Sequence, residues 1–218
     1  MLIGHFGVAL AVKRAAPSAS LGTLVMAAQL ADLLWPFFVL LGLEHVRIDP
    51  GITRVTPLDF THYPYTHSLV ADVGWALLFG AVYGLVRRNW RVAAWLGALV
   101  LSHWMLDFVV HRPDLPLWPG GPKVGLGVWN SLPISMVLEF ILFGGGVYVY
   151  WRATRARDRL ATVLFGAFVA VLAIIYVAAV FGPPPPSVAA IVITGLAGWL
   201  FVAWGYWIDR HRVPAICV

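Results

Sequence analysis

Histidine and carboxylate side chains lie inside stretches of this chain that are otherwise almost entirely apolar. His103 and Asp107 are four residues apart in such a stretch, so one turn of helix places both side chains on the same face. An imidazole nitrogen and a carboxylate oxygen placed in this way bind one divalent ion together, or one of them orients the other from outside the set of ligands. The spacing therefore predicts a metal site.

Other groups of metal-ligand type occur in neighbouring apolar stretches. An ionisable group at the centre of a bilayer costs about 3 kcal/mol or more, so each of these groups is a candidate for function. Taken singly, such a residue more often caps a helix, bonds to a carbonyl group or pairs with an arginine, and Asp72 fits that alternative well. His45, His62 and His211 fall in loops or in the tail, where a solvated histidine is expected. The remaining candidates are His5, Asp32, His67, His103, Asp107, His111 and Glu139.

The stretches that carry these groups are long and apolar enough to cross a membrane. Hydrophobic residues make up 61% of the 218 residues and charged residues only 11%, whereas a soluble domain carries about 25% charged residues. A spanning helix needs about 20 consecutive, mostly apolar residues. Six segments meet this requirement, at residues 21–43, 68–86, 92–110, 133–151, 160–181 and 188–208.

The first twelve residues are apolar but do not have the pattern of a signal peptide. A signal peptide carries its positive charge before the apolar region, whereas Lys13 and Arg14 follow this one. We expect residues 1–12 to form a short helix that enters the membrane without crossing it. The expected fold class is thus all-α, a polytopic transmembrane helical bundle with about six spanning helices plus this short N-terminal helix.

Residues 1–218 are expected to form a single membrane domain. Residues 1–140 contain all of the candidate ligands and form the expected core of the site. Residues 141–218 contain the end of the fourth helix and two further helices that pack alongside. Those two helices either shape a groove for lipid or form a contact in a homo-oligomer, and the sequence does not separate these alternatives.

The basic residues are distributed unevenly between the two sides of the expected spans. Cytoplasmic loops are enriched in Lys and Arg, and eleven of the fifteen basic residues fall on the side of the C-terminus. This pattern predicts a multi-pass protein of a bacterial-type cytoplasmic (inner) membrane, with a cytoplasmic C-terminus and the loops 44–67 and 111–132 facing outward. The candidate ligands then converge on the outer half of the bundle. The four basic residues on the outer side are Arg47, Arg54, Arg112 and Lys123.

The net charge of +5 would suit a nucleic-acid partner, but a basic fringe on the cytoplasmic side explains it without one. We therefore expect no nucleic-acid partner. Cys217 is the only cysteine, which excludes a disulfide framework within the chain and a cysteine metal cluster.

Two local signals concern helix geometry. Pro36 lacks an amide proton and its ring clashes with the preceding turn, so it predicts a kink in the first span near Asp32. The run of glycines at residues 144–146 predicts close contact between two helices, because glycine lets two backbones approach each other.

The loop 111–132 is too rich in proline and glycine to be helical and too aromatic to be a plain linker. We interpret it as a lid over the site. Its two basic residues, Arg112 and Lys123, suit an anionic group of a substrate such as phosphate. The alternative is that the loop only caps the bundle and that both charges face lipid headgroups.

The polar residues of the first 140 positions resemble a known family. The pattern is similar to that of the YdjM-type inner-membrane proteins, which are described as membrane-bound metal-dependent hydrolases and are related remotely to zinc-dependent phospholipase C and P1-type nucleases. The residues that carry the resemblance are Gly4 and His5, Gln29 and Asp32, Thr66, His67 and Ser68, Ser102, His103 and Asp107, His111, and Glu139.

The resemblance implies a set of metal ligands and a reaction. The implied ligands are His5, Asp32, His67, His103, Asp107, His111 and Glu139. The soluble relatives carry a further His-x-x-x-Glu pair, and Ser135 occupies that histidine position here, so we expect one or two divalent ions, zinc above all, rather than three. Such a site hydrolyses a phosphoester or another ester, with Asp32 or Asp107 as the catalytic base. The substrate implied by a site at the outer headgroup level is a membrane lipid or a lipid-linked molecule.

Two other functions remain open on sequence alone. The same acids and histidines would serve an ion- or proton-coupled transport protein, although such a protein is expected to carry polar groups on the cytoplasmic half as well. The protein would instead be a non-catalytic membrane scaffold if its metal site were fully closed by protein ligands.

Overall fold

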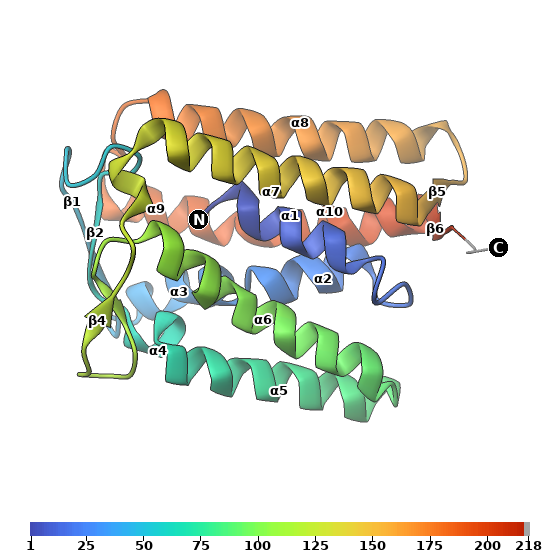
Figure 1. Ribbon diagram of the computed structural model, residues 1–218, viewed down its shortest axis with the longest axis horizontal. Coiled ribbons are helices and arrows are strands. Elements are labelled where there is room, and N and C mark those ends of the chain that lie inside the picture. The colour runs from blue at the N-terminus through green and yellow to red at the C-terminus, as the bar shows by residue number, and fades with distance from the viewer. Residues whose placement is uncertain (216–218) are drawn as a thin grey trace.

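The computed structural model describes residues 1–215, so Cys217 lies outside the described residues. The chain forms an elongated bundle of helices that run along one common direction (Figure 1). Within residues 1–215, the helices that are long and apolar enough to cross a membrane are α5 (Leu69–Arg87), α6 (Trp90–Val110), α7 (Leu132–Ala153), α8 (Arg159–Phe181) and the pair α9 (Val188–Leu196) and α10 (Gly198–His211), which together cover Val188–His211. The bent pair α2 (Leu21–Ala28) and α3 (Leu30–Leu40) has the length and apolarity of a sixth span when its two helices are counted together, and the alternative for such a pair is a re-entrant loop. The expected all-α bundle is confirmed.

The outward faces of these helices are apolar. Leu77 is 70% exposed, Ile141 65% and Ile174 66%, and each lies well inside its helix. Large apolar side chains exposed along several helices are unfavourable in water and favourable against lipid tails. The protein is therefore a multi-pass membrane protein.

Helix α1 (Ile3–Val12) lies inside the bundle and is too short to cross a bilayer (Figure 1). Ile3, Ala9 and Leu10 on this helix are fully buried. The helix runs against α7, with α2 and α6 on its other sides. This arrangement confirms the short N-terminal helix and places it at the centre of the fold.

The crossing of α1 and α7 depends on glycine. A Cβ atom on Gly146 would lie 2.0 Å from the carbonyl oxygen of Gly7, and a Cβ on Gly7 would lie 2.4 Å from the carbonyl oxygen of Leu142. Gly144 and Gly145 face away, and a Cβ on either would meet nothing within 4 Å. Of the three glycines expected to allow close helix contact, only Gly146 does so here.

The first span bends at Gln29 and not at Pro36. Helices α2 and α3 meet there at 58°, with Gln29 outside helical geometry at φ −105° and ψ 11°. Helix α3 continues through Pro36. The proline ring packs closely on α9 at Gly195, where a Cβ atom would lie 2.5 Å from Pro36 Cγ. The expected kink at Pro36 was therefore wrong in position, and the bend lies one turn before Asp32 instead of after it.

The two ends of the bundle carry different loops (Figure 1). One end carries two hairpins and short helical turns, and the other end carries one pair of short strands near the C-terminus. At the first end lie β1 (His45–Ile48), β2 (Leu58–His62), α4 (Pro64–His67), β3 (Leu115–Pro116), β4 (Lys123–Val124) and the 3-10 helix η1 (Val128–Asn130). At the opposite end, β5 (Thr154–Ala156) pairs antiparallel with β6 (Arg212–Pro214).

A buried ion pair closes the end that carries β5 and β6. The Lys13 ammonium donates to the Ala19 carbonyl at 2.7 Å and pairs with Asp209 at 3.2 Å. Asp209 also accepts the hydroxyl of Tyr150 at 3.3 Å and the backbone amide of Leu21. Helices α1, α2, α7 and α10 are thereby tied together at this end, which leaves the hairpin end to carry the site.

The glycine crossing predicts a contrast between neighbouring substitutions. Gly146→Ala should destabilise the protein by about 1–3 kcal/mol or more, because the new methyl group must push α1 and α7 apart. Gly144→Ala should leave stability unchanged or slightly raised, because its Cβ meets open space and alanine is the better helix former. Thermal unfolding of both variants in the same detergent measures the difference. Equal unfolding temperatures would contradict the close approach of α1 and α7.

Candidate metal centre

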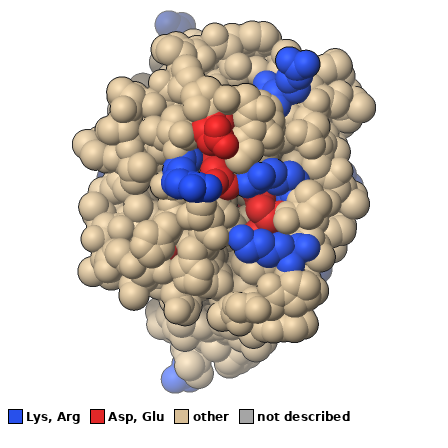
Figure 2. All heavy atoms as spheres, turned by 90° about the vertical axis from the view of Figure 1, so that its left-hand side faces the viewer, with Lys and Arg blue, Asp and Glu red and all other residues tan. Residues whose placement is uncertain are grey.

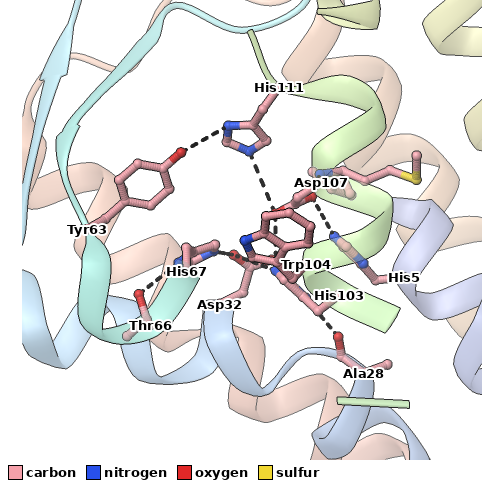
Figure 3. A network of polar contacts seen from close by, with 12 residues as sticks. His5, Ala28, Asp32, Tyr63, Thr66, His67, His103, Trp104, Asp107 and His111 are labelled. Atoms are coloured by element: carbon pink, nitrogen blue, oxygen red, sulfur yellow. Dashed lines mark hydrogen bonds and ion pairs between the residues drawn. The ribbon is translucent and has the colours of Figure 1, made fainter. Parts of the chain in front are cut away.

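Side chains from four helices converge at the hairpin end of the bundle (Figure 3). His5 comes from α1, Asp32 from α3, His67 from α4, and His103 and Asp107 from successive turns of α6. The last two face the same direction, with His103 Nε2 at 3.3 Å from Asp107 Oδ2. The side-by-side placement predicted from their spacing is confirmed.

Nitrogen and carboxylate oxygen atoms in this cluster lie at the separations that ligands of one metal ion have. Two ligands each about 2.0–2.1 Å from a tetrahedral ion lie about 3.3–3.4 Å apart. Asp107 Oδ1 is 3.1 Å from His5 Nε2, and Asp107 Oδ2 is 3.6 Å from Nε2 of His111. Asp32 Oδ1 is 3.3 Å from His67 Nε2 and 3.8 Å from His103 Nε2.

The donors fall into two overlapping sets. One contains His5, His103 and Asp107 and the other Asp32, His67 and His103, and within each set the donor atoms lie within 4.8 Å of one another. His103 belongs to both but offers one free nitrogen, so it is able to bind only one ion. The geometry fits one ion held by either set, or two ions of which only one takes His103.

The free nitrogen of His103 is fixed by a bond on the other side of its ring. His103 Nδ1 lies 2.8 Å from the carbonyl oxygen of Ala28, and a carbonyl only accepts, so Nδ1 carries the proton. Ala28 is the last residue of α2, where carbonyl groups have no partner within the helix. The bend at Gln29 thus supplies the acceptor that directs the Nε2 lone pair of His103 into the cluster. That nitrogen is buried and has no hydrogen-bond partner within residues 1–215.

His67 is oriented by a chain of two further residues. The Thr66 hydroxyl donates to Glu44 at 2.7 Å and lies 2.7 Å from His67 Nδ1. Because its proton is directed to the carboxylate, the hydroxyl oxygen accepts from His67 Nδ1, and Nε2 keeps its lone pair. Glu44 is 1% exposed and also accepts the backbone amides of Tyr65 and Thr66.

His111 is held in the same manner. Its Nδ1 lies 3.0 Å from the carboxylate of Asp114, which also accepts the hydroxyl of Tyr63 at 3.2 Å. Burial, with Asp114 alongside, raises the pKa of the Tyr63 hydroxyl above its ordinary value, so that group stays protonated and donates. His111 Nε2 is then free to face Asp107.

His5 differs from the other three. Its ring stacks on that of His103 with centroids 3.8 Å apart and planes 5° apart. Its Nε2 faces Asp107, whereas its Nδ1 is buried without a hydrogen-bond partner within the described residues. The amino group of Met1 forms an ion pair with the same Asp107 oxygen that faces His5. Both carboxylate oxygens of Asp107 therefore face nitrogen atoms.

Glu139 and Asp72 lie close by but outside both sets of donors. The two carboxylate oxygens of Glu139 accept the backbone amides of Leu2 and Gly4, at 2.8 and 2.7 Å, so this side chain anchors the start of α1 beside the site. Asp72 is 1% exposed, and neither of its oxygens has a hydrogen-bond partner within residues 1–215.

A cavity of about 310 Å³ reaches the cluster. Asp32, His67, Asp107, His111 and Glu139 line its polar side, while apolar side chains that include Trp35, Phe60, Trp129 and Val180 form the rest of its wall. The Asp32 side chain is 45% exposed, against 3% for Asp107. Asp32 is thus the carboxylate that the cavity reaches most openly.

The last helices of the chain take part in this wall. Tyr176, Ala179 and Val180 of α8 line the cavity together with Pro183 and Pro185 of the segment that follows. From the sequence we expected the last two helices either to shape a groove for lipid or to form a contact in a homo-oligomer. In the structure α8 and the segment after it complete one side of the cavity.

Arg112 and Lys123 do not line the cavity. The Arg112 guanidinium pairs with Asp59 and, at 2.9 Å, with Asp114. Lys123 donates to the Thr61 carbonyl at 3.2 Å and so joins the two hairpins. The loop 111–132 covers His111, because its Trp129 packs on that ring with centroids 4.2 Å apart.

Sequence reasoning missed the groups that orient the histidines. Glu44 and Asp114 are loop acids with no recognisable spacing to a ligand, and Ala28 acts through its carbonyl alone. The only signal for Glu44 in the sequence is that an acid follows directly after an apolar span. That signal is weak.

Comparison of the chain with protein-family models, with curated proteins and with solved structures found no match in any of the three. The resemblance described above therefore rests on the quoted residues and stays a prediction. Any functional argument has to come from the geometry of the site.

The relay behind His67 predicts an effect on metal affinity. Thr66→Val keeps the size of the side chain but removes the hydroxyl, and loss of such an outer partner lowers metal affinity by about 10- to 100-fold. Thr66→Ser keeps the hydroxyl and should bind metal like the unaltered protein. Competition with a chelating dye on both purified variants measures the affinities. If Thr66→Val bound metal as tightly as Thr66→Ser, the relay would not orient His67.

Proposed function

We propose that this protein is a membrane-embedded, metal-dependent hydrolase that acts on a lipid or phosphoester substrate at the outer, non-cytoplasmic face of a bacterial-type inner membrane. The observation that carries the proposal is the arrangement of three imidazoles around two carboxylates. His67, His103 and His111 each have Nδ1 held by a separate acceptor, and each points Nε2 at Asp32 or Asp107. A purely structural histidine has no need of a free, directed nitrogen in an apolar interior.

The donor set fits a divalent ion of the zinc type. Imidazole nitrogen and carboxylate oxygen suit Zn²⁺, and the outer partners of the histidines are those that metal-binding histidines commonly have. A divalent ion held by either donor set, His5, His103 and Asp107 or Asp32, His67 and His103, would supply a Lewis acid that makes water acidic enough to attack an ester near neutral pH.

The two aspartates suit different tasks. Asp107 is buried and faces nitrogen groups on both oxygens, so it is suited to holding metal or to bridging two ions. Asp32 faces His67 through one oxygen, and its side chain is 45% exposed to the cavity. Asp32 is thus the better placed to take a proton from an attacking water. Glu139 holds the start of α1 in position and so supports His5.

Solvent access to Asp32 argues against a purely structural metal site. Structural zinc sites are closed by four protein ligands, whereas catalytic sites keep one position open to water or substrate. The cavity reaches Asp32, Asp107 and His111. An open position beside the ligands favours catalysis over a scaffold role.

The shape and location of the cavity favour a lipid. Its wall is largely apolar, and one side is formed by α8, whose neighbouring residues Ile174, Val177 and Phe181 are exposed on the outer surface of the bundle. The hairpin end carries four of the fifteen basic residues, which is the pattern of a non-cytoplasmic face. A lipid that enters beside α8 would bring its headgroup to the metal ligands at that face.

A second candidate is a cation or proton transport protein, and one observation favours it. The first span is broken at Gln29, one turn before Asp32, and broken spans beside a buried acid are a common feature of transporters. The same break also supplies the carbonyl that orients His103, so the hydrolase accounts for it without a transport path.

The central test is metal content together with hydrolysis. The purified protein should contain a stoichiometric divalent ion by plasma mass spectrometry, and His103→Ala/Asp107→Ala should lose it, because these residues belong to the buried donor set. The same samples are assayed on phospholipids and on a soluble phosphodiester. Turnover should fall by at least about 100-fold in the double variant, as expected when a catalytic metal is removed.

The matched control is His45→Ala/His62→Ala. These two histidines are paired across β1 and β2 and do not line the cavity. This variant loses two surface histidines and should keep both metal and turnover. A folded, unaltered protein that binds no divalent ion even after reconstitution would overturn the hydrolase.

The transport candidate is separated by a flux assay. The proposed function predicts that vesicles containing the protein show no Asp32-dependent flux of protons or divalent cations, while the same preparation hydrolyses its substrate. Flux that is abolished in Asp32→Asn, in a preparation without hydrolytic activity, would favour the transporter.

A further inference from the structure

Four basic side chains lie at the hairpin end of the bundle. Figure 2 shows Lys and Arg side chains lying against acidic side chains near the centre of this face. Three of the four have acceptors within the protein. Arg47 pairs with Asp59 at 2.6 Å, Arg112 pairs with Asp59 and Asp114, and Lys123 donates to a backbone carbonyl. These three charges are used to hold the hairpins together.

Arg54 is the exception. Its guanidinium makes no hydrogen bond or ion pair with any group of residues 1–215, and the side chain is exposed. Asp49 and Asp59, the two acids nearest in sequence, do not pair with it. Arg54 is therefore available to an anion from outside the protein.

The position of Arg54 relates it directly to the candidate metal centre. Arg54 lines a hollow of about 150 Å³ on the outer surface, together with Pro50, Thr53 and Pro184. This hollow and the cavity at the metal ligands share part of their walls, namely Val55, Thr56, Pro57, Ala179, Val180, Pro183 and Pro185. The hollow thus forms a vestibule next to the cavity.

The backbone that carries Arg54 is held in place, although its side chain is free. The Arg54 amide donates to the Trp129 carbonyl at 3.1 Å, and Trp129 itself lines the cavity. The Thr53 hydroxyl donates to the Thr56 carbonyl at 2.8 Å and accepts the Thr56 amide at 2.9 Å, which closes a tight turn around Arg54. A fixed base with a free charged end is the arrangement of a recognition residue.

We propose that Arg54 recognises the anionic phosphate of the substrate, so that the hydrolase prefers a lipid with a net negative headgroup over a zwitterionic one. This inference rests on the proposed function and assigns the specificity of the same site. A planar guanidinium binds two phosphate oxygens at once, which a lysine does not. Arg54 thus takes the role that the sequence suggested for Arg112 and Lys123, because those two side chains bind acceptors within the protein.

Binding and turnover are measured separately to test it. The purified protein is titrated calorimetrically with dioctanoyl phosphatidic acid, dioctanoyl phosphatidylcholine and glycerol 1-phosphate. Arg54→Gln should bind the phosphatidic acid about tenfold more weakly, the effect of losing one charge-assisted contact, with little change for phosphatidylcholine. Arg54→Lys should fall between. Arg47→Gln is the matched control. It removes the same charge from the same face, and Arg47 lines neither the hollow nor the cavity.

Each outcome is decisive. Equal losses in Arg54→Gln and Arg47→Gln would show a general surface charge and overturn the assignment, as would unaltered binding in Arg54→Gln or no preference for phosphatidic acid in the unaltered protein. Glycerol 1-phosphate bound as tightly as the lipid would assign the site to a free phosphate and overturn the lipid preference. Arg54-dependent lipid binding without hydrolysis would contradict the proposed function and leave this inference standing.

Discussion

Asp107 places a carboxylate deep inside an apolar bundle, and much of the structure serves to make that position tolerable. An unpaired charge in such surroundings costs several kcal/mol. Here the carboxylate faces His5 and the Met1 amino group on one oxygen and His103 and His111 on the other. Those nitrogen groups lie on or next to α1 and α6, which must therefore remain in contact at the hairpin end. The close crossing of α1 and α7 through Gly7 and Gly146 makes that contact possible.

The histidine rings are oriented both by side-chain acceptors and by the course of the backbone. One acceptor is the loop acid Asp114, one is the Thr66 hydroxyl, which itself donates to Glu44, and one is a carbonyl exposed by the end of a helix. A straight first span would pair the Ala28 carbonyl within the helix and leave the His103 ring without a fixed direction. The first span thus serves the cluster in two ways. Its bend at Gln29 orients His103, and its Asp32 contributes a carboxylate.

Much of the fold was accessible from the sequence because bilayer thickness sets the length of each span. The limits of the six spans and the pairing of His103 with Asp107 followed from hydropathy and helical period. The bend position did not, because α3 continues through Pro36, whose ring packs on Gly195, a residue 159 positions later whose contact no local pattern records. The engagement of Arg112 and the availability of Arg54 depend in the same way on the packing of two hairpins. The outer partners Glu44 and Asp114 escaped notice because a loop acid becomes informative only when its neighbours in space are known.

The burial of α1 has a consequence for how the protein is made. His5 meets Asp107 across 102 residues and Gly4 meets Glu139 across 135, so α1 finds all of its neighbours only after α7 has been synthesised. Until then a ten-residue apolar helix, too short to span, must wait at the membrane surface or beside the translocon. The centre is thus completed by the docking of α1 into a nearly finished bundle. Under the proposed function, metal capture would be a late step of biogenesis, and a cell would have a membrane-inserted, metal-free intermediate to protect.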